Sequence, residues 1–134
     1  MAEGVILKSK EVFYRGKNLE DLKKLDVREV AKFLPSRSRR TVLRNFQVHE
    51  AFIRRCEIQI IAKKKIRTHL RDIIILPKLV GMTLMIHNGK LFTEITVTHK
   101  MIGHRLGEFS LTRVKVQHGE AGLGATKSSA GEKK

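Results

Sequence analysis

The histidine side chains are the first candidates for metal binding or acid–base chemistry in this chain. No two of the six histidines have the HExxH or HxxxH spacing that brings two imidazoles to one metal ion. Cys56 is the only cysteine, and a single thiolate cannot complete a zinc finger. We therefore predict that the chain has neither a metal site nor a cofactor.

The strongest chemical signal is the excess of basic side chains. The 134 residues include 28 Lys or Arg and 13 Asp or Glu, a net charge of +15. Such a chain suits a polyanionic partner, because neutralising phosphates releases their counterions. Residues 37–71 hold eleven basic and two acidic groups, a net charge of +9, and we favour a phosphate-binding ridge there over a solvated helix face. Only seven residues are aromatic, which favours recognition of shape and phosphate over base stacking.

His104 and Glu108 lie four residues apart and could form an acid–base pair. No nucleophile or second positioned carboxylate accompanies them, so we favour a structural or RNA-facing role and predict that the protein is not an enzyme and has no catalytic residues. Glu108 could orient His104 or Arg105, or accept hydrogen bonds from the backbone amides of its own turn. The sequence leaves both roles open.

The chain lacks the patterns of a membrane or secreted protein. Its apolar runs, such as residues 73–76 and 79–86, are far shorter than the ~20 residues that cross a bilayer. Residues 1–13 lack the apolar core of a secretory signal, and a lone cysteine suits a reducing compartment. We expect a cytoplasmic protein without a membrane partner.

Helix signals dominate the first half of the chain. Asn18 and Asp26 are good N-cap residues, Asp26 and Glu29 have the spacing of a capping box, and Pro35 ends the second helix. A longer helical stretch is predicted from residue 37 to residue 64 or 65, with a break near Asn45. Its buried face is predicted from an apolar stripe at helical spacing, which comprises Phe46, His49, Ile53, Cys56 and Ile60.

Strand signals begin at Thr68. The β-branched run 73–75 is typical of a strand, and Asn88-Gly89 predicts a hairpin with a two-residue turn. That turn would place Ile86 opposite Leu91 and Leu84 opposite Thr93 on one apolar face. The opposite face would carry Met85, His87, Lys90 and Phe92, and we favour a second core face there over a contact surface.

Shorter elements are expected after the hairpin. Thr98 can cap a one-turn helix that ends at Gly103, residues 105–109 can form a tight turn around Gly107, and residues 111–116 are strand-like. The core is predicted from the apolar positions of this region, which are Leu79, Val80, Met82, Leu84, Ile86, Ile95, Val97, Met101, Ile102, Leu106 and Phe109.

These elements predict an α+β fold with a small antiparallel or mixed sheet that contains the Asn-Gly hairpin, together with short helices. We divide the chain into a helical, basic N-terminal extension (1–66), an α+β core (67–116) and a flexible C-terminal tail (117–134). The tail has glycines but no aromatic residue, so its ordering is expected to depend on a partner.

Several motifs in fixed order resemble one family. The segments THLRDIIILPKLVGMTLMIHNGK, MIGHRLGEF and GEAGLGATKSS, between residues 68 and 129, closely resemble the small-subunit ribosomal protein of universal family nineteen, in its archaeal and eukaryotic branch, whose eukaryotic cytosolic member is numbered fifteen. The short ending GEKK favours the archaeal type. The resemblance implies a structural protein of the ribosome with a role in translation. It implies binding to rRNA in the 3′ major (head) domain, beside ribosomal protein thirteen, as a single copy rather than a homo-oligomer. The tail would run toward the decoding A site, where tRNA is a candidate partner.

The RNA-binding surface is predicted from the basic segment and from the positions that match the family's motifs. The segment and these positions give Arg37, Arg39, Arg40, Arg44, Arg67, His69, Arg71, Lys78, Asn88, Gly89, Lys90, Gly103, His104, Arg105, Arg113, Lys115, His118 and Lys127. At the hairpin tip, we expect exposed backbone N–H groups and Lys90 to meet a phosphate.

Two departures from the family put individual contacts in question. The bacterial pattern has Trp and a second Arg where this chain has His69 and Asp72, so base stacking and one phosphate contact are not expected to carry over unchanged. The alternative function is a general basic architectural protein that binds nucleic acids without a fixed site. It predicts equal binding to unrelated RNA and duplex DNA.

Overall fold

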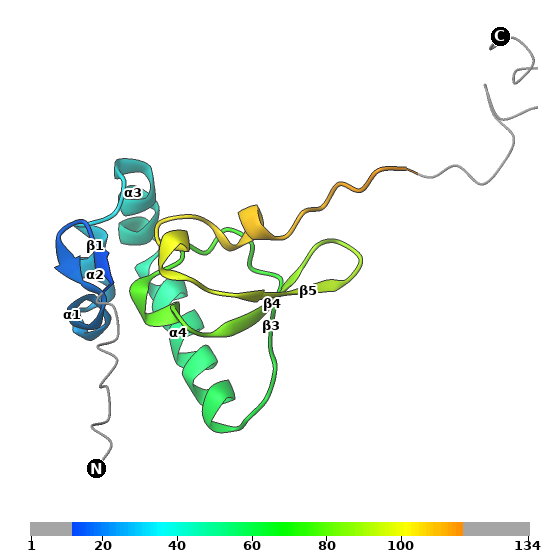
Figure 1. Ribbon diagram of the computed structural model, residues 1–134, viewed down its shortest axis with the longest axis horizontal. Coiled ribbons are helices and arrows are strands. Elements are labelled where there is room, and N and C mark those ends of the chain that lie inside the picture. Colours follow the sequence, from blue (N-terminus) through cyan, green and yellow to red (C-terminus); the bar gives the residue numbers. More distant parts are fainter. Residues whose placement is uncertain (1–11, 117–134) are drawn as a thin grey trace, which may run out of the picture.

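The computed structural model describes residues 12–116. This part is α+β, with four α-helices, a two-stranded antiparallel sheet and a three-stranded mixed sheet (Figure 1). The predicted fold class is confirmed. The predicted tail and the first eleven residues lie outside the described part. Within it, every helix is too short or too polar to span a lipid bilayer.

The chain begins with a small hairpin and two short helices. Strands β1 (Phe13–Tyr14) and β2 (Lys17–Asn18) pair across Arg15 and Gly16, which both have positive φ, as a type I′ turn requires. Asn18 then caps α1 (Leu19–Lys24), since its side chain accepts the Glu20 N–H at 3.2 Å. Helix α2 (Val27–Ala31) starts after Asp26, whose N–H donates to Glu29 Oε2 at 3.3 Å. Both predicted caps are confirmed.

Pro35 separates α2 from the basic helices, as predicted. Helix α3 (Ser36–Arg44) and helix α4 (Phe46–Ile61) meet at Asn45, where the backbone leaves helical geometry. The break is therefore where the sequence placed it, although α4 ends three residues before the expected end at residue 64. The middle of the predicted stripe on α4 is buried, with Ile53 and Cys56 among its members, whereas Ile60 is exposed. Phe52 is also buried, outside the predicted stripe.

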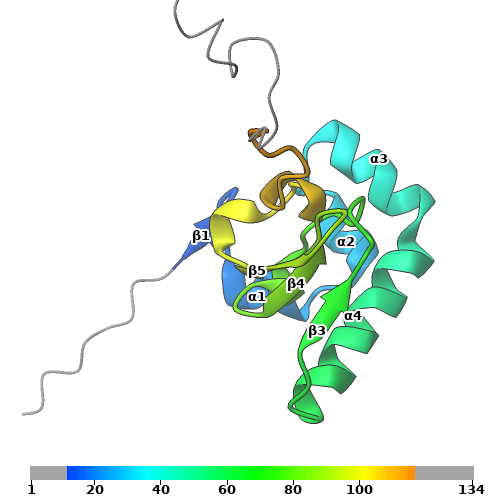
Figure 2. The same ribbon diagram turned by 90° about the vertical axis from the view of Figure 1, so that its right-hand side faces the viewer.

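The mixed sheet has the order β3–β4–β5. Strand β3 (Ile66–Thr68) runs parallel to β4 (Thr83–His87), which pairs antiparallel with β5 (Phe92–Thr96). Figure 2 shows α4 running alongside β3. The side chains that face the helices, such as Ile66, Leu84 and Ile86, are buried in the core shared with α4.

The register of the β4–β5 hairpin corrects the predicted one. Ile86 lies opposite Thr93 and Leu84 opposite Ile95, so each residue is paired two positions further along than expected. The cause is the Asn88 side chain, whose Oδ1 accepts the Lys90 and Leu91 N–H groups at 2.9 and 2.8 Å. Asn88 N–H bonds to Leu91 O, which moves the turn centre to Gly89-Lys90, with positive φ at Gly89 alone, as in type II′ turns. Leu91 is consequently 71% exposed.

The other face of the sheet is not a second core face, which corrects the favoured interpretation. Met85, His87 and Phe92 are only half-buried, and Arg67 and Glu94 are exposed. The helices of the described chain pack against the Leu84 and Ile86 side, which leaves this face without a covering layer. It has the exposure of a contact surface.

Residues 73–76 form a buried extended segment instead of a strand in the sheet. Ile74 makes a single antiparallel bridge to Arg105, and Ile75 exchanges hydrogen bonds with the turn that follows β5: its N–H donates to His104 O at 2.8 Å and its O accepts the Gly103 N–H at 3.0 Å. All four residues, 73–76, are at most 4% exposed. The β-branched run was thus correctly expected to be extended, but its burial was not predicted, and its partner is a loop and not a strand.

The 3-10 helices follow the sequence signals well. Pro77–Leu79, His99–Met101 and Leu106–Phe109 each form a 3-10 helix, of which the last two were expected. Residues 111–116 carry no strand, because their backbone finds no partner; Leu111, Val114 and Val116 are exposed. Figure 1 shows this segment leaving the body of the protein.

One hydrophobic core joins the helices to the sheet. Every predicted core residue is buried in it or packed against it. The remaining buried residues come mostly from the helices and from 73–76, including Val30, Leu34, Val42 and Phe52. The helical residues before 66 therefore share the core of residues 67–116.

His49 connects α4 to the buried segment through both ring nitrogens. Its Nδ1–H donates to Asn45 O at 2.8 Å, and its Nε2 accepts the Ile74 N–H at 3.2 Å. The ring is 2% exposed, so these partners cannot be replaced by bulk water. This bonding requires the neutral imidazole with its proton on Nδ1.

We expect His49→Leu to lower the free energy of unfolding by roughly 1 to 3 kcal/mol, because it leaves the buried Ile74 N–H without an acceptor. Urea unfolding measures the change. Gln47→Leu, an exposed site in the same helix, is the matched control and should have little effect. Equal stability of His49→Leu and the wild type would contradict this role.

Cys56 is a buried thiol whose pKa is raised to about 11, chiefly because burial removes the water that would stabilise its thiolate. We expect the folded protein to react slowly with a thiol-specific disulfide reagent at pH 7 to 9 and rapidly once urea unfolds it. A Gln47→Cys, Cys56→Ala variant exposes a thiol on the same helix and should react at once. Fast labelling of native Cys56 would show that the core around it opens readily.

Candidate nucleic-acid interface

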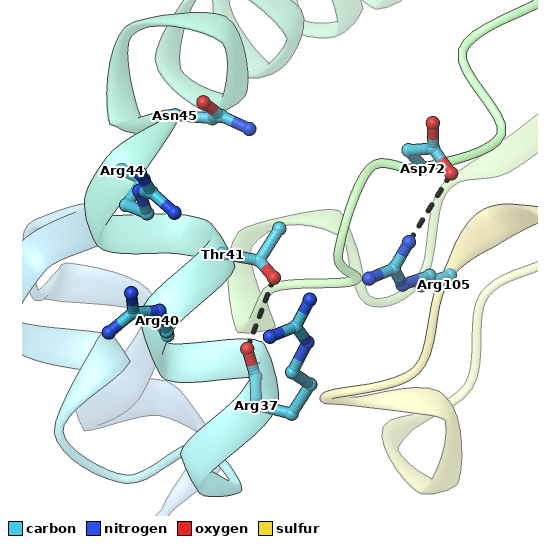
Figure 3. A pocket seen from close by; sticks show the side chains of 7 residues that line it. All are labelled: Arg37, Arg40, Thr41, Arg44, Asn45, Asp72 and Arg105. Carbon is cyan, nitrogen blue, oxygen red and sulfur yellow. Dashed lines mark hydrogen bonds and ion pairs between the residues drawn. The ribbon is translucent and has the colours of Figure 1, made fainter.

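A basic groove lies between α3 and the loops that carry Asp72 and Arg105. Its volume is about 310 Å³. Figure 3 shows Arg37 and Thr41 on the side of α3 toward Asp72 and Arg105, with Arg40 further round the helix. The lining residues are Arg37, Arg40, Thr41, Arg44, Asn45, Asp72 and Arg105.

Helix α3 presents its arginines to the groove because of their spacing. Arg37, Arg40 and Arg44 lie three and four residues apart, which places them on one face of the helix. Val42 points away from that face and is buried in the core, which fixes the rotation of the helix. Sequence reasoning had placed these arginines on one basic segment, and the structure brings them together.

Arg105 completes the groove from the opposite wall. Its Nη1 lies 3.3 Å from Asp72 Oδ1, in an ion pair whose aspartate side chain is 94% exposed. Such an exposed pair is weak. The groove therefore sets four guanidinium groups against one carboxylate, an excess of positive charge that favours anionic groups.

Glu108 positions the turn that carries Arg105. Its Oε2 lies 2.8 Å from His104 Nδ1, and its Oε1 accepts the Arg105 N–H at 3.3 Å. The two roles that the sequence left open are therefore both present. His104 is exposed, and its ring stands nearly perpendicular to that of Phe109, with 6.0 Å between ring centroids.

A second cavity continues the groove toward the sheet. It measures about 580 Å³ and shares Thr41, Asn45 and Asp72 with the basic groove. From there it extends past Val48 and Leu70 to His69. Thr41, Asn45 and Asp72 were not predicted; only their proximity to the arginines in sequence could have indicated them.

Two predicted arginines have a structural role. Arg71 donates to the carbonyl oxygens of His87, Gly107 and Ser110 at 2.6 to 2.8 Å. Arg39 donates to the carbonyls of Ala31, Lys32 and Leu34 at the end of α2. Both guanidinium groups therefore bond to the protein's own backbone, and we do not include them in the RNA-binding surface.

The hairpin tip differs from expectation in its backbone. The Lys90 and Leu91 N–H groups bond to Asn88 Oδ1 and the Gly89 N–H bonds to His87 Nδ1 at 3.1 Å. These amides already have partners in this structure, because the Asn88 and His87 side chains fold back over the turn, so the backbone contact with a phosphate stays a prediction. Only the Lys90 side chain stays exposed as a charge at the tip.

Gly103 holds the loop of Arg105 against the helices. Its φ is +87°, and a Cβ there would lie 3.3 Å from Pro35 Cδ. Its carbonyl accepts the Ser38 hydroxyl of α3 at 2.8 Å. Gly103 therefore sets the distance between the two walls of the groove, a role that spacing alone did not indicate.

The other predicted residues are scattered. Arg67 is exposed on β3, Lys78 is half-buried beside Pro77, and Arg113 and Lys115 are exposed on the extended segment after Ser110. His118 and Lys127 lie outside the described residues. The basic groove thus gathers four of the predicted residues, and the remainder lie apart from it.

We expect Arg71→Ala to lower the free energy of unfolding by roughly 1 to 3 kcal/mol, because it leaves partly buried carbonyls without a donor. Thermal or urea unfolding measures this change. Arg40→Ala removes the same charge from the exposed groove and should change stability little. Equal stability of the two variants would contradict the structural role of Arg71.

Fold and groove together define a class: a small basic α+β protein whose arginines line one surface groove. The particular family follows from comparison with known sequences. The model of the family described as Ribosomal protein S19 matches residues 40–118, and the chain belongs to that family, as its motifs predicted.

Archaeal relatives extend the match to nearly the whole chain. The small ribosomal subunit protein uS19 of Methanocella arvoryzae is 48% identical over 128 residues, which cover 94% of this chain and 89% of the relative. The uS19 of Halorubrum lacusprofundi is 47% identical over 124 residues, or 90% of this chain and 88% of the relative. As a member of this family the chain is a structural constituent of the small ribosomal subunit, a cytoplasmic ribonucleoprotein particle, and serves in translation.

Proposed function

We propose that the protein binds the 3′ major (head) domain of small-subunit rRNA and that the groove between α3 and Arg105 holds its phosphates. The observation that carries this proposal is the groove itself, in which four arginines face one exposed aspartate. Phosphate oxygens accept paired hydrogen bonds from guanidinium groups, and this geometry makes arginine the preferred residue for such contacts.

The row of arginines suits a nucleic-acid strand better than a single anion. Arg37 and Arg44 are seven residues apart, which corresponds to about 10 Å along the axis of α3. This length exceeds one phosphate group, so successive phosphates can be held along the helix. Contacts of this kind position the protein on RNA without depending on base identity.

The exposed basic residues outside the groove extend the proposed surface. Lys90 at the hairpin tip, His104 beside Arg105, and Arg113 and Lys115 on the extended segment are all exposed. They can contact phosphates that flank the groove. We also propose that the C-terminal tail, which lies outside the described residues, approaches the decoding A site and tRNA.

The proposed protein neighbour is ribosomal protein thirteen. The end of α4 supports a protein contact, because Ile58, Ile60 and Ile61 are exposed there, Ile61 by 82%. Exposed apolar residues in a cluster are typical of protein interfaces. A protein that fills one defined position in the subunit is needed in one copy and not as a homo-oligomer.

The test is a variant in which Arg37, Arg40 and Arg44 are all changed to Gln. We expect weaker binding to small-subunit rRNA and a salt slope reduced by roughly 2 to 3, since each phosphate contact contributes about 0.7 to 0.9. Binding is measured between about 50 and 200 mM salt, with unrelated RNA and duplex DNA as competitors.

The matched control changes Arg54, Arg55 and Lys64 to Gln, which removes the same charge from exposed positions in and just after α4. It should retain more of the affinity and salt slope than the groove variant. Equal loss in both variants, or equal wild-type binding to duplex DNA, would favour a general architectural protein without a fixed site.

A further inference from the structure

The open face of the mixed sheet carries a compact cluster of rings, which we call the platform: Arg67, His69, His87 and Phe92. The ring centroids of His69 and His87 are 4.5 Å apart, and Phe92 lies 5.1 and 4.9 Å from them. The Arg67 guanidinium carbon is 5.6 Å from the centroid of Phe92. The platform thus combines three rings and a cation from all three strands or their ends.

The sheet register brings these residues together. His87 and Phe92 are direct partners in the β4–β5 pair. Thr68 pairs with Ile86 in the parallel β3–β4 pair, which places His69 beside His87 at the next position. The shift of the hairpin turn is what makes Phe92 the partner of His87, since the predicted register would have placed Lys90 there.

The platform is held in place by bonds that leave its outer side free. Arg71 donates to His87 O at 2.6 Å, and His87 Nδ1 accepts the Gly89 N–H. His69 is exposed, and His87 and Phe92 are half-buried. A fixed, partly open set of rings binds a flat ligand at little cost in conformational entropy.

We propose that an unpaired nucleobase of the small-subunit rRNA stacks on this platform. Every base has a π-face that stacks on aromatic rings, and arginine adds a cation–π contribution. His69 also lines the cavity that adjoins the basic groove. A strand whose phosphates lie in the groove can therefore continue along this cavity toward the platform.

The charge around the platform favours RNA over a protein partner. Arg67 in the platform and Lys90 at the hairpin tip are exposed, and the cavity that His69 lines adjoins the groove with the arginines of α3. Glu94 of β5 lies on the same face, two residues from Phe92 and opposite Met85, so one exposed carboxylate stands against these basic groups. The inference rests on the proposed function, because it names the part of the RNA that the sheet recognises.

The test compares the full chain with Phe92→Leu and His69→Leu for binding to small-subunit rRNA. We expect each variant to bind roughly 5- to 150-fold more weakly, which corresponds to the loss of one stacked base. The salt slope should stay at the wild-type value, because stacking releases no counterions. Phe92→Tyr keeps the ring and should bind like the wild type.

Controls separate this inference from protein stability and from the proposed function. Phe13→Leu removes an exposed aromatic ring from β1, away from the groove and the platform, and should not change affinity, while thermal unfolding verifies that each variant folds. If Phe92→Leu does not fold, the exposed His69 variant decides. Wild-type affinity in His69→Leu overturns the platform even where the arginine variant loses affinity and salt slope, and would assign this face to a neighbouring protein. If the wild type binds unrelated RNA as tightly as small-subunit rRNA, both proposals are overturned.

Discussion

The buried extended segment 73–76 is the constraint on which the rest of the structure depends. Its side chains fill the core, so its backbone polar groups must all find partners away from water. The partners come from two directions: His49 of α4 accepts the Ile74 N–H, and the loop 103–106 bonds to Ile73 and Ile75. Satisfying this segment therefore brings α4 and the Arg105 loop together. Because α3 is joined to α4 at Asn45, this arrangement also places α3 opposite Arg105, and the basic groove lies between them.

Features that depend on local chemistry could be predicted from the sequence. The caps at Asn18 and Asp26, the break at Asn45 and the 3-10 helix after Thr98 each arise from a few adjacent residues, and all are present. The hairpin register could not be predicted, although its turn is local. Asn-Gly has two uses in a turn: both residues with positive φ, or Asn as a side-chain acceptor with Gly alone at positive φ. The structure adopts the second, and every cross-strand pair follows from that choice.

The sequence predicted that the candidate site is built from arginines, but it could not predict which arginines line it. Residues 37–71 carry most of the net charge, and their arginines are chemically equivalent in sequence. Their contacts divide them: Arg37, Arg40 and Arg44 line the groove, whereas Arg39 and Arg71 bond to backbone carbonyls. The two structural arginines depend on where α2 and the loop 107–110 end, which is tertiary information. A basic segment thus indicates a polyanion, while the number of its charges overstates the number of contacts.

The platform shows how a correction in the fold changes the expected mode of recognition. The chain has only seven Phe and Tyr residues, and this low number argued against stacking. That argument assumes that Phe and Tyr are the only rings available and that they are spread evenly over the surface. The sheet instead concentrates Phe92 with two histidines within about 5 Å of one another. Imidazole rings also stack on bases, so the number of aromatic residues matters less than their placement on one uncovered face. Phosphate contacts along α3 position the protein, and a base on the sheet would fix its register on the RNA.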